Sequence, residues 1–100
     1  MVLSGRLHKA AQLRTTPAGI PIARFVLVHR SRRPEAGQMR EVECRLTVVA
    51  SGAALTAGLG QLPAGAGVRV TGFLSRAGYR APTGHVELHA LDIETVPENG

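Results

Sequence analysis

Apolar and polar residues alternate along five segments of the chain, and a period of two is typical of β-strands with one buried face. These segments are residues 2–9, 20–29, 40–50, 67–75 and 85–96. The alternation is clearest in 40–50, where one face carries Val42, Cys44, Leu46, Val48 and Ala50. This pattern predicts that Cys44 lies in the core, where a free thiol packs as a small apolar side chain.

The second of these strands shows which way its side chains point. Arg24 marks the solvent side, so Phe25 and Leu27 are predicted to face the core. Val26 and Val28 then share the outer face with Arg24. Two apolar residues on an outer face indicate a surface that a partner covers.

The last two strands carry features of irregular pairing. Gly72 in the fourth strand suits a bulge or a sharp bend. In the fifth strand the apolar face switches between Leu88 and Leu91. This switch indicates either a bulge near His89-Ala90 or a strand that is covered on both sides.

The segments between the strands differ in character. Residues 16–19 read Thr-Pro-Ala-Gly, which is typical of a turn. Residues 31–39 are polar and predict a loop between the second and third strands. In 51–62 the leucines recur at spacings of four and three, and Ser51 can cap the start, so a short helix is predicted there.

The order of elements is therefore three strands, a short helix and two strands. This order predicts an all-β fold: a five-stranded OB-fold Greek-key barrel, with the short helix between strands three and four. An SH3-like barrel is the nearest alternative, but its helical element comes later in the chain. The length fits a single OB-fold domain spanning 1–100, with 97–100 as a short tail.

Charge is distributed unevenly along this barrel. Twelve basic residues face seven acidic ones, giving a net charge of +5. Residues 1–34 hold seven of the basic residues and no acid, whereas nothing after Arg80 is basic. All the cations except Lys9 are arginines, whose planar fork suits phosphate. The distribution favours a polyanionic partner.

Catalytic and metal chemistry have no candidate residues. The single cysteine excludes an intrachain disulfide and a thiolate zinc site, and the four histidines lack metal-ligand spacing. The acids form no catalytic pair, and Ser51 has no His–Asp partner pattern. We expect no enzyme activity, no cofactor and no metal. The chain has neither the apolar run of a signal peptide nor that of a membrane span, so a cytoplasmic protein is expected.

Two predicted loops and one strand carry the candidate binding residues. A cationic groove with a stacking ring holds single-stranded nucleic acid without reading its sequence. The residues are Arg30, Arg32, Arg33, Arg40 and Arg45 in and after the second-to-third loop, and Arg76, Tyr79, Arg80 and His85 around the fourth-to-fifth loop. Glu35, Glu41 and Glu43 partly cancel this local field.

Short motifs spread over nearly the whole chain resemble the primosomal replication protein N (PriB) family of proteobacteria. The most specific are Gly-Ile-Pro at 19–21, Phe-Val-Leu-Val-His-Arg-Ser at 25–31 and Glu-Ala-Gly at 35–37. Weaker matches lie at 2–5, 17–18, 51–52, 72–75 and 88–90.

The resemblance implies a homodimer of OB folds that binds single-stranded DNA. It also implies a role in replication restart, in which the protein stabilises the PriA helicase on a stalled fork and passes the complex on towards DnaT and helicase loading. Arg14, like Arg30 and Arg40, matches a position that is basic in the family. The dimer would form through the first strand and neighbouring surface, at Val2, Leu3, Ser4, Arg6, Val26 and Val28.

This chain departs from the family at positions that matter for DNA. Enteric members carry an aromatic residue in the Glu-Ala-Gly loop and another on strand three, where this chain has Gln38 and Glu43. Lysines of the fourth-to-fifth loop are replaced in part by Gly78 and His85. We therefore expect weaker or rearranged binding, with Tyr79 as a substitute stacking residue.

Two alternatives to a central role in DNA binding stay open. The protein could be chiefly an adaptor for the helicase, with DNA contact secondary. It could also be an OB module for structured RNA, which a preference for RNA hairpins over oligo-dT would indicate.

Overall fold

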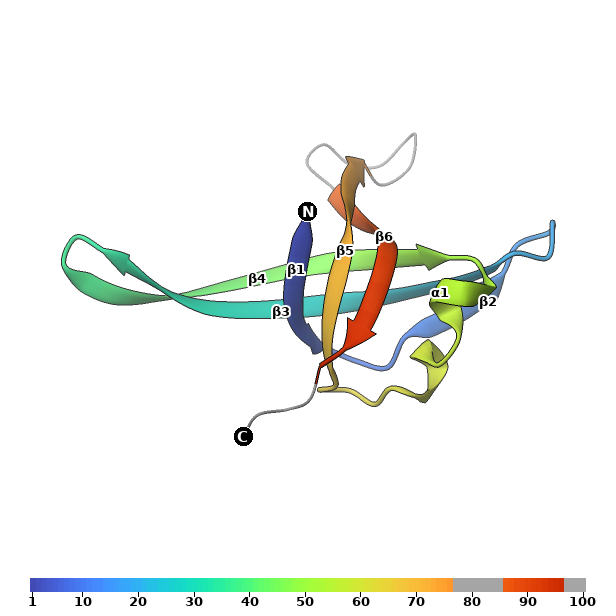
Figure 1. Ribbon diagram of the computed structural model, residues 1–100, viewed down its shortest axis with the longest axis horizontal. Helices are drawn as coiled ribbons and strands as arrows, with labels where there is room; N and C mark the ends of the chain where they lie inside the picture. The colour runs from blue at the N-terminus through green and yellow to red at the C-terminus, as the bar shows by residue number, and fades with distance from the viewer. Residues whose placement is uncertain (77–85, 97–100) are drawn as a thin grey trace.

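Five strands close into a barrel, and one hairpin projects far beyond it (Figure 1). The structure is a computed structural model that describes residues 1–76 and 86–96, apart from the side chains of Arg33 and Glu35. In chain order the elements are β1 (Val2–Leu7), β2 (Gln12–Thr15), β3 (Pro21–Glu35), β4 (Gln38–Ser51), α1 (Ala53–Thr56), the 3-10 turn η1 (Leu59–Gln61), β5 (Gly67–Arg76) and β6 (Val86–Thr95).

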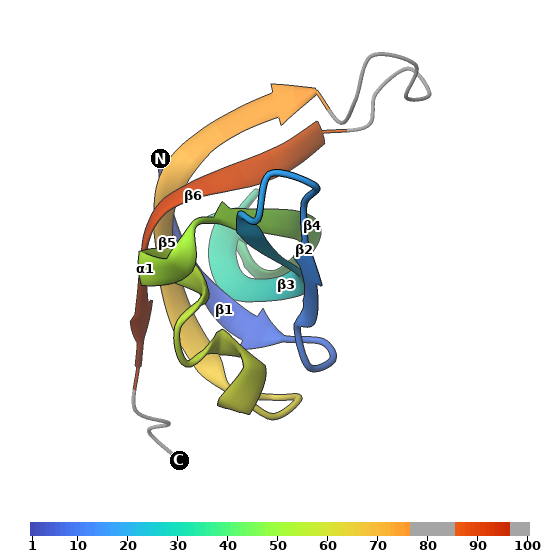
Figure 2. The same cartoon turned by 90° about the vertical axis from the view of Figure 1, so that its right-hand side faces the viewer.

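The sheet order is β1-β5-β6-β4-β3-β2, and β1 also pairs with β3, which closes the ring. Every pairing is antiparallel except the parallel contact of β4 with β6. Figure 2 shows β5 and β6 curving round one side of the barrel with α1 beside them. The predicted five-stranded barrel, with its short helix before β5, is confirmed.

β2 is a sixth strand that the sequence did not predict. Within the described part of the chain it pairs with β3 alone, and all four of its residues are exposed. Because neither face of β2 is buried, its sequence shows no apolar alternation from which a strand could be read.

The core confirms the inward positions of the second predicted strand, since Phe25 is 4% and Leu27 0% exposed. The helical segment contributes Leu59, which is buried, while Leu55 and Leu62 pack against the same cluster. The prediction that Ser51 caps this helix is wrong. Gly52 occupies the N-cap position, and no side chain makes a capping hydrogen bond there.

A bulge interrupts the pairing of β5 with β6. Thr71 lies opposite Asp92 and Gly72 opposite Ala90, so Leu91 has no counterpart on β5. This extra residue reverses the inward face of β6, so of the two explanations of the sequence switch the bulge is the observed one, at Leu91 directly after His89-Ala90. Gly72 is buried against the backbone of His89, and a Cβ at this position would collide with the His89 carbonyl oxygen.

The predicted loop at 31–39 is wrong, because β3 and β4 continue through it as one long hairpin (Figure 1). A two-residue turn joins them, with φ of 52° at Ala36 and 78° at Gly37. Positive φ at both positions gives the turn that matches the twist of paired strands. The sequence of 31–39 shows no strand pattern because, among the described side chains, this part of the hairpin has no buried face.

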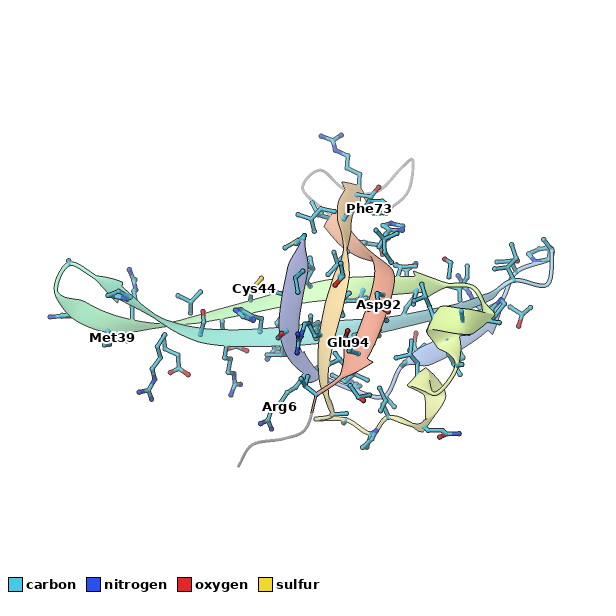
Figure 3. The ribbon with its side chains drawn as sticks, viewed as in Figure 1. Arg6, Met39, Cys44, Phe73, Asp92 and Glu94 are labelled. Atoms are coloured by element: carbon cyan, nitrogen blue, oxygen red, sulfur yellow. The ribbon has the colours of Figure 1, made fainter. Side chains whose placement is uncertain are left out.

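The assignment of Cys44 to the core is also wrong. Cys44 is exposed, and Val42 on the same face is 39% exposed. Cys44 lies on β4 beside β1, where the hairpin leaves the barrel (Figure 3), and Val42 follows two residues farther towards the hairpin turn. Their alternation continues that of buried Val48 and Ala50, but the barrel ends before it reaches them.

Candidate nucleic-acid interface

The outer face of the hairpin gathers three of the predicted binding arginines. Register places Arg30 opposite Glu43 and Val28 opposite Arg45, and Arg32 lies opposite Glu41. Residues opposite each other in an antiparallel pair share a face, and so do residues two apart along one strand. Arg30, Arg32 and Arg45 therefore lie on one exposed surface, which we call the outer hairpin face.

Glu43 sits between two of these arginines. Its Oε1 lies 3.7 Å from Arg30 Nη2 and 3.4 Å from Arg45 Nε. The three side chains are between 41% and 64% exposed. Exposed ion pairs contribute about 0–1 kcal/mol and are screened by salt, so a phosphate can replace this carboxylate. Glu43 thus competes with an anionic ligand for Arg30 and Arg45.

Arg40 lies on the opposite face of the hairpin. It is one residue from Glu41, and alternation therefore groups it with Val42 and Cys44. Arg33 is its register partner, but the Arg33 side chain is outside what the structure describes. The hairpin arginines consequently do not form one patch, as a compact loop would have allowed.

β2 extends the outer hairpin face along the barrel. Arg14 pairs in register with Ile22, and Gln12 pairs with Arg24. Arg14, Gln12 and Arg30 lie on the same outer side of the sheet. Arg30 lies roughly 26 Å along β3 from Ile22, at 3.3 Å per residue. Arg14 is thus aligned with Arg30 but far from it.

Arg24 is not among the binding residues predicted from the sequence, but it belongs to this surface. Its guanidinium forms an ion pair with Glu87, whose residue exposure is 7%. A groove of about 270 Å³ lies beside Arg24, and its lining includes Lys9, Gln12, Val26 and Thr47. The outer face is therefore hollowed where β2 and the residues before it approach β3.

The fourth-to-fifth loop falls mostly outside the described residues. Arg76 ends β5 as an exposed residue opposite Val86. Tyr79, Arg80 and His85 lie outside the described residues, as does Gly78. Gln38 is exposed directly after the hairpin turn and Glu43 is exposed on β4, so neither hairpin position at which the resemblance implies an aromatic residue carries one.

A stacked pair of rings was missed in the sequence. Phe73 on β5 and His89 on β6 lie opposite each other, with ring centroids 5.5 Å apart and planes 12° apart. The alternation that assigns Val68 and Val70 to the core puts Phe73 on the outer face. That alternation could have identified it.

The predicted dimer residues surround one edge of the barrel. β1 pairs with β5 from Val2 to Arg6, but with β3 only at Arg6 and Leu7. Val2, Ser4 and Arg6 are exposed, Val26 and Val28 are half-buried, and Leu3 packs against the core. A second groove of about 810 Å³ borders this edge, with Ser4, Arg6 and Val28 in its lining. The Ser4 carbonyl oxygen lies 2.6 Å from Nδ1 of His29.

Within residues 1–76 and 86–96, no His, Cys, Asp and Glu side chains group as a metal site. No helix in the same part of the chain is long and apolar enough to cross a membrane.

Comparisons with known proteins agree on one kind of protein. A family model described as another single-strand binding protein family matches residues 1–90. The replication restart protein PriB of Proteus mirabilis is 40% identical over 96 residues, covering 96% of this chain and 91% of that protein. The structure of priB from Ralstonia solanacearum has a TM-score of 0.74 at 25% identity and covers 96% of each chain.

A second solved structure, of a single-stranded DNA binding protein, has a similar fold. The crystal structure of a deletion mutant of the single-stranded DNA binding protein from Thermus aquaticus has a TM-score of 0.82 at 26% identity. The match covers 96% of this chain but 49% of that one, so this chain spans about half the length of the Thermus protein.

Proposed function

This chain belongs to the PriB replication restart family of single-strand binding proteins, and from this membership we propose that it binds single-stranded DNA through the outer hairpin face, without catalysing a reaction. The observation that carries the proposal is the alignment of Arg30, Arg32 and Arg45 on one exposed surface. Guanidinium groups bind phosphates through paired hydrogen bonds, and ordered strands hold them at fixed spacing.

The extension of this surface towards β2 supports a strand that runs beyond the hairpin. Arg14 and Arg24 lie on the same side of the sheet, next to the groove lined by Gln12 and Val26. Phosphates bound by the hairpin would leave the following nucleotides over this part of the barrel. We propose that Arg40 and Arg76, which lie off this line, contribute through the general field. The same general role is proposed for Arg33 and Arg80, whereas Tyr79 is proposed as the substitute stacking residue and His85 as a further contact of the fourth-to-fifth loop.

In replication restart, the proposed role is to stabilise PriA on a stalled fork and to pass the complex on towards DnaT. The family resemblance supports this role. A second candidate, an adaptor in which helicase contact dominates, is favoured by Glu43. A carboxylate between Arg30 and Arg45 lowers the affinity of this surface for any anion.

Replacing Arg30 with alanine is expected to weaken binding of oligo-dT about fivefold to tenfold at roughly 100 mM salt. Fluorescence-polarisation titrations across salt should also show a slope smaller by about 0.7, because one phosphate contact is lost. Arg69→Ala is the matched control, since Arg69 is an exposed arginine on β5 opposite Glu94.

Three outcomes would contradict central DNA binding at this face. Arg30→Ala could behave like Arg69→Ala, which would move the site elsewhere. Wild-type binding of oligo-dT could be barely measurable while PriA stimulation persists, which would identify the adaptor. A preference for RNA hairpins over oligo-dT would identify the RNA-binding module.

We further propose that two copies associate along β1 to form the homodimer. The stretch Val2–Gly5 pairs with β5 on one side only, and Val2 is 60% exposed. An incompletely paired edge with an exposed apolar residue is suited to pairing with a second strand.

Light scattering is expected to give twice the chain mass of 10.5 kDa. Val2→Lys should shift the mass towards the monomer at low micromolar concentration, because a charge replaces an apolar contact at the edge. Met39→Lys is the control, because Met39 is 66% exposed near the hairpin turn. A monomeric wild type, or a Val2→Lys variant with the wild-type mass, would argue against this interface.

A further inference from the structure

The stacked pair Phe73–His89 is an exposed aromatic surface that the hairpin site does not use. Phe73 is 51% exposed, whereas His89 is half-buried beside it. The rings are nearly parallel, with 12° between their planes and 5.5 Å between their centroids. Figure 3 shows Phe73 near the far end of β5, well away from Asp92 and Glu94 on β6.

The backbone around the pair brings β5 and β6 close together. Gly72 lets β5 approach the His89 carbonyl more closely than any side chain would permit. The bulge at Leu91 follows two residues later on β6 and sets which residues of that strand face outward. Because the two rings already stack on each other, a ligand that stacks on Phe73 need not order them.

Register connects this pair to the proposed DNA surface. A row crosses the outer face of five adjacent strands, and it consists of Gln12, Arg24, Val49, His89 and Phe73. At about 4.8 Å per strand, three strand steps separate Arg24 from Phe73, roughly 14 Å measured along the curved wall of the barrel. One single strand can span that distance, with phosphates near Arg24 and a base at Phe73.

The composition of this row favours a nucleobase over a purely ionic ligand. Val49 is apolar but only 7% exposed, so the ring pair next to it, in which Phe73 is 51% exposed, supplies the flat apolar face that a ligand can reach. Bases stack on such faces whatever their identity, because every base has a π-face. We propose that Phe73, supported by His89, is a base-stacking platform that continues the single-strand path from the hairpin across β6 and β5. This proposal rests on the proposed function.

The platform compensates for what the hairpin lacks. Gln38 and Glu43 occupy the hairpin positions where the family resemblance implies rings. In this chain the hairpin then supplies charge, and the platform on the barrel supplies stacking. The two parts act on different groups of the nucleotide, so they can be tested separately.

A tryptophan reporter tests stacking directly, because the chain contains no tryptophan. In Phe73→Trp the only indole stands on the platform, and oligo-dT is expected to quench its fluorescence by stacking. Leu91→Trp is the control, since Leu91 is 66% exposed at the bulge outside the row. Quenching of both variants alike, or of neither, would overturn the proposal.

Affinity provides the second readout. Phe73→Ala is expected to weaken oligo-dT binding roughly tenfold, the size of one lost base stack, while Leu91→Ala changes it less than about twofold. An abasic oligonucleotide of equal length should bind wild type and Phe73→Ala equally, because it offers phosphates without bases. His89→Ala should bind oligo-dT with an affinity between those of wild type and Phe73→Ala.

The outcomes separate the platform from the function on which it rests. If wild type binds oligo-dT with a steep salt dependence but Phe73→Ala binds equally well, the platform is wrong and the hairpin site stands. If Phe73→Trp fluorescence changes with protein concentration and not with oligo-dT, this face is a protein contact and the platform is wrong. If wild type does not bind oligo-dT at all, both proposals fail.

Discussion

Replacing Glu43 with tryptophan is expected to raise the affinity for oligo-dT at least roughly tenfold, since one base stack contributes about 1–3 kcal/mol. Two physical changes act in the same direction. The substitution removes the carboxylate that lies 3.7 Å from Arg30 and 3.4 Å from Arg45, and it adds a ring on an exposed strand. Titration with oligo-dT at several salt concentrations measures both contributions.

Glu43→Gln separates the charge from the ring. It keeps the shape of the side chain and frees both guanidiniums, so we expect a gain of about twofold to fivefold with a steeper salt dependence. The tryptophan variant should exceed it, and the difference should vanish on an abasic oligonucleotide. Unchanged binding in both variants would show that phosphates do not approach the outer hairpin face.

Replacing Gly72 with alanine is expected to lower the free energy of unfolding by about 3 kcal/mol or more, because overpacking against a fixed backbone is poorly relieved. The new Cβ would meet the His89 carbonyl oxygen across the bulge. Urea denaturation followed by circular dichroism measures the change, with the slope checked for two-state behaviour.

The sign of this effect is itself informative. In an ordinary strand position glycine is less stable than alanine by about 0.5–1 kcal/mol, so Gly72→Ala would then be stabilising. Thr71→Ala is the neighbouring control and should cost less than about 1 kcal/mol, because Thr71 is half-buried with no such approach. A stabilised Gly72→Ala variant would show that β5 and β6 are not held together as closely as described.

The barrel could be predicted because its strands bury one face. Phe25 and Leu27 alternate with Arg24 and Val26, and burial follows that alternation. The bulge could also be predicted, because the apolar face of β6 changes side within the strand. In both cases the physical cause, removal of apolar area from water, leaves a pattern in the sequence.

The hairpin beyond the barrel could not be predicted in the same way. Residues 36–39 are all exposed, so no burial pattern distinguishes this end of the hairpin from a loop. Cys44 illustrates the difficulty, because its alternation with buried residues continues past the end of the core. Only the pairing register, which sequence alone does not supply, shows where the barrel stops.

The sequence could predict which kind of residue forms the candidate site, but not how these residues are arranged on the hairpin. Arginines were expected on this segment, and Arg30 and Arg45 share a face. Arg40 was grouped with them because a loop imposes no alternation, whereas paired strands place it on the opposite side. The sequence did not identify Phe73 as a binding residue, because its proposed role depends on stacking against His89. That proximity follows from the cross-strand register.

The projecting hairpin also divides the molecule into parts of unequal cooperativity. Its distal half is held by cross-strand hydrogen bonds and the turn at Ala36-Gly37, with no apolar core behind it. Local opening of this half therefore leaves the barrel intact, as in regions with few buried apolar contacts. A nucleic acid that bridges β3 and β4 would oppose such fraying, so binding free energy and hairpin order are thermodynamically linked.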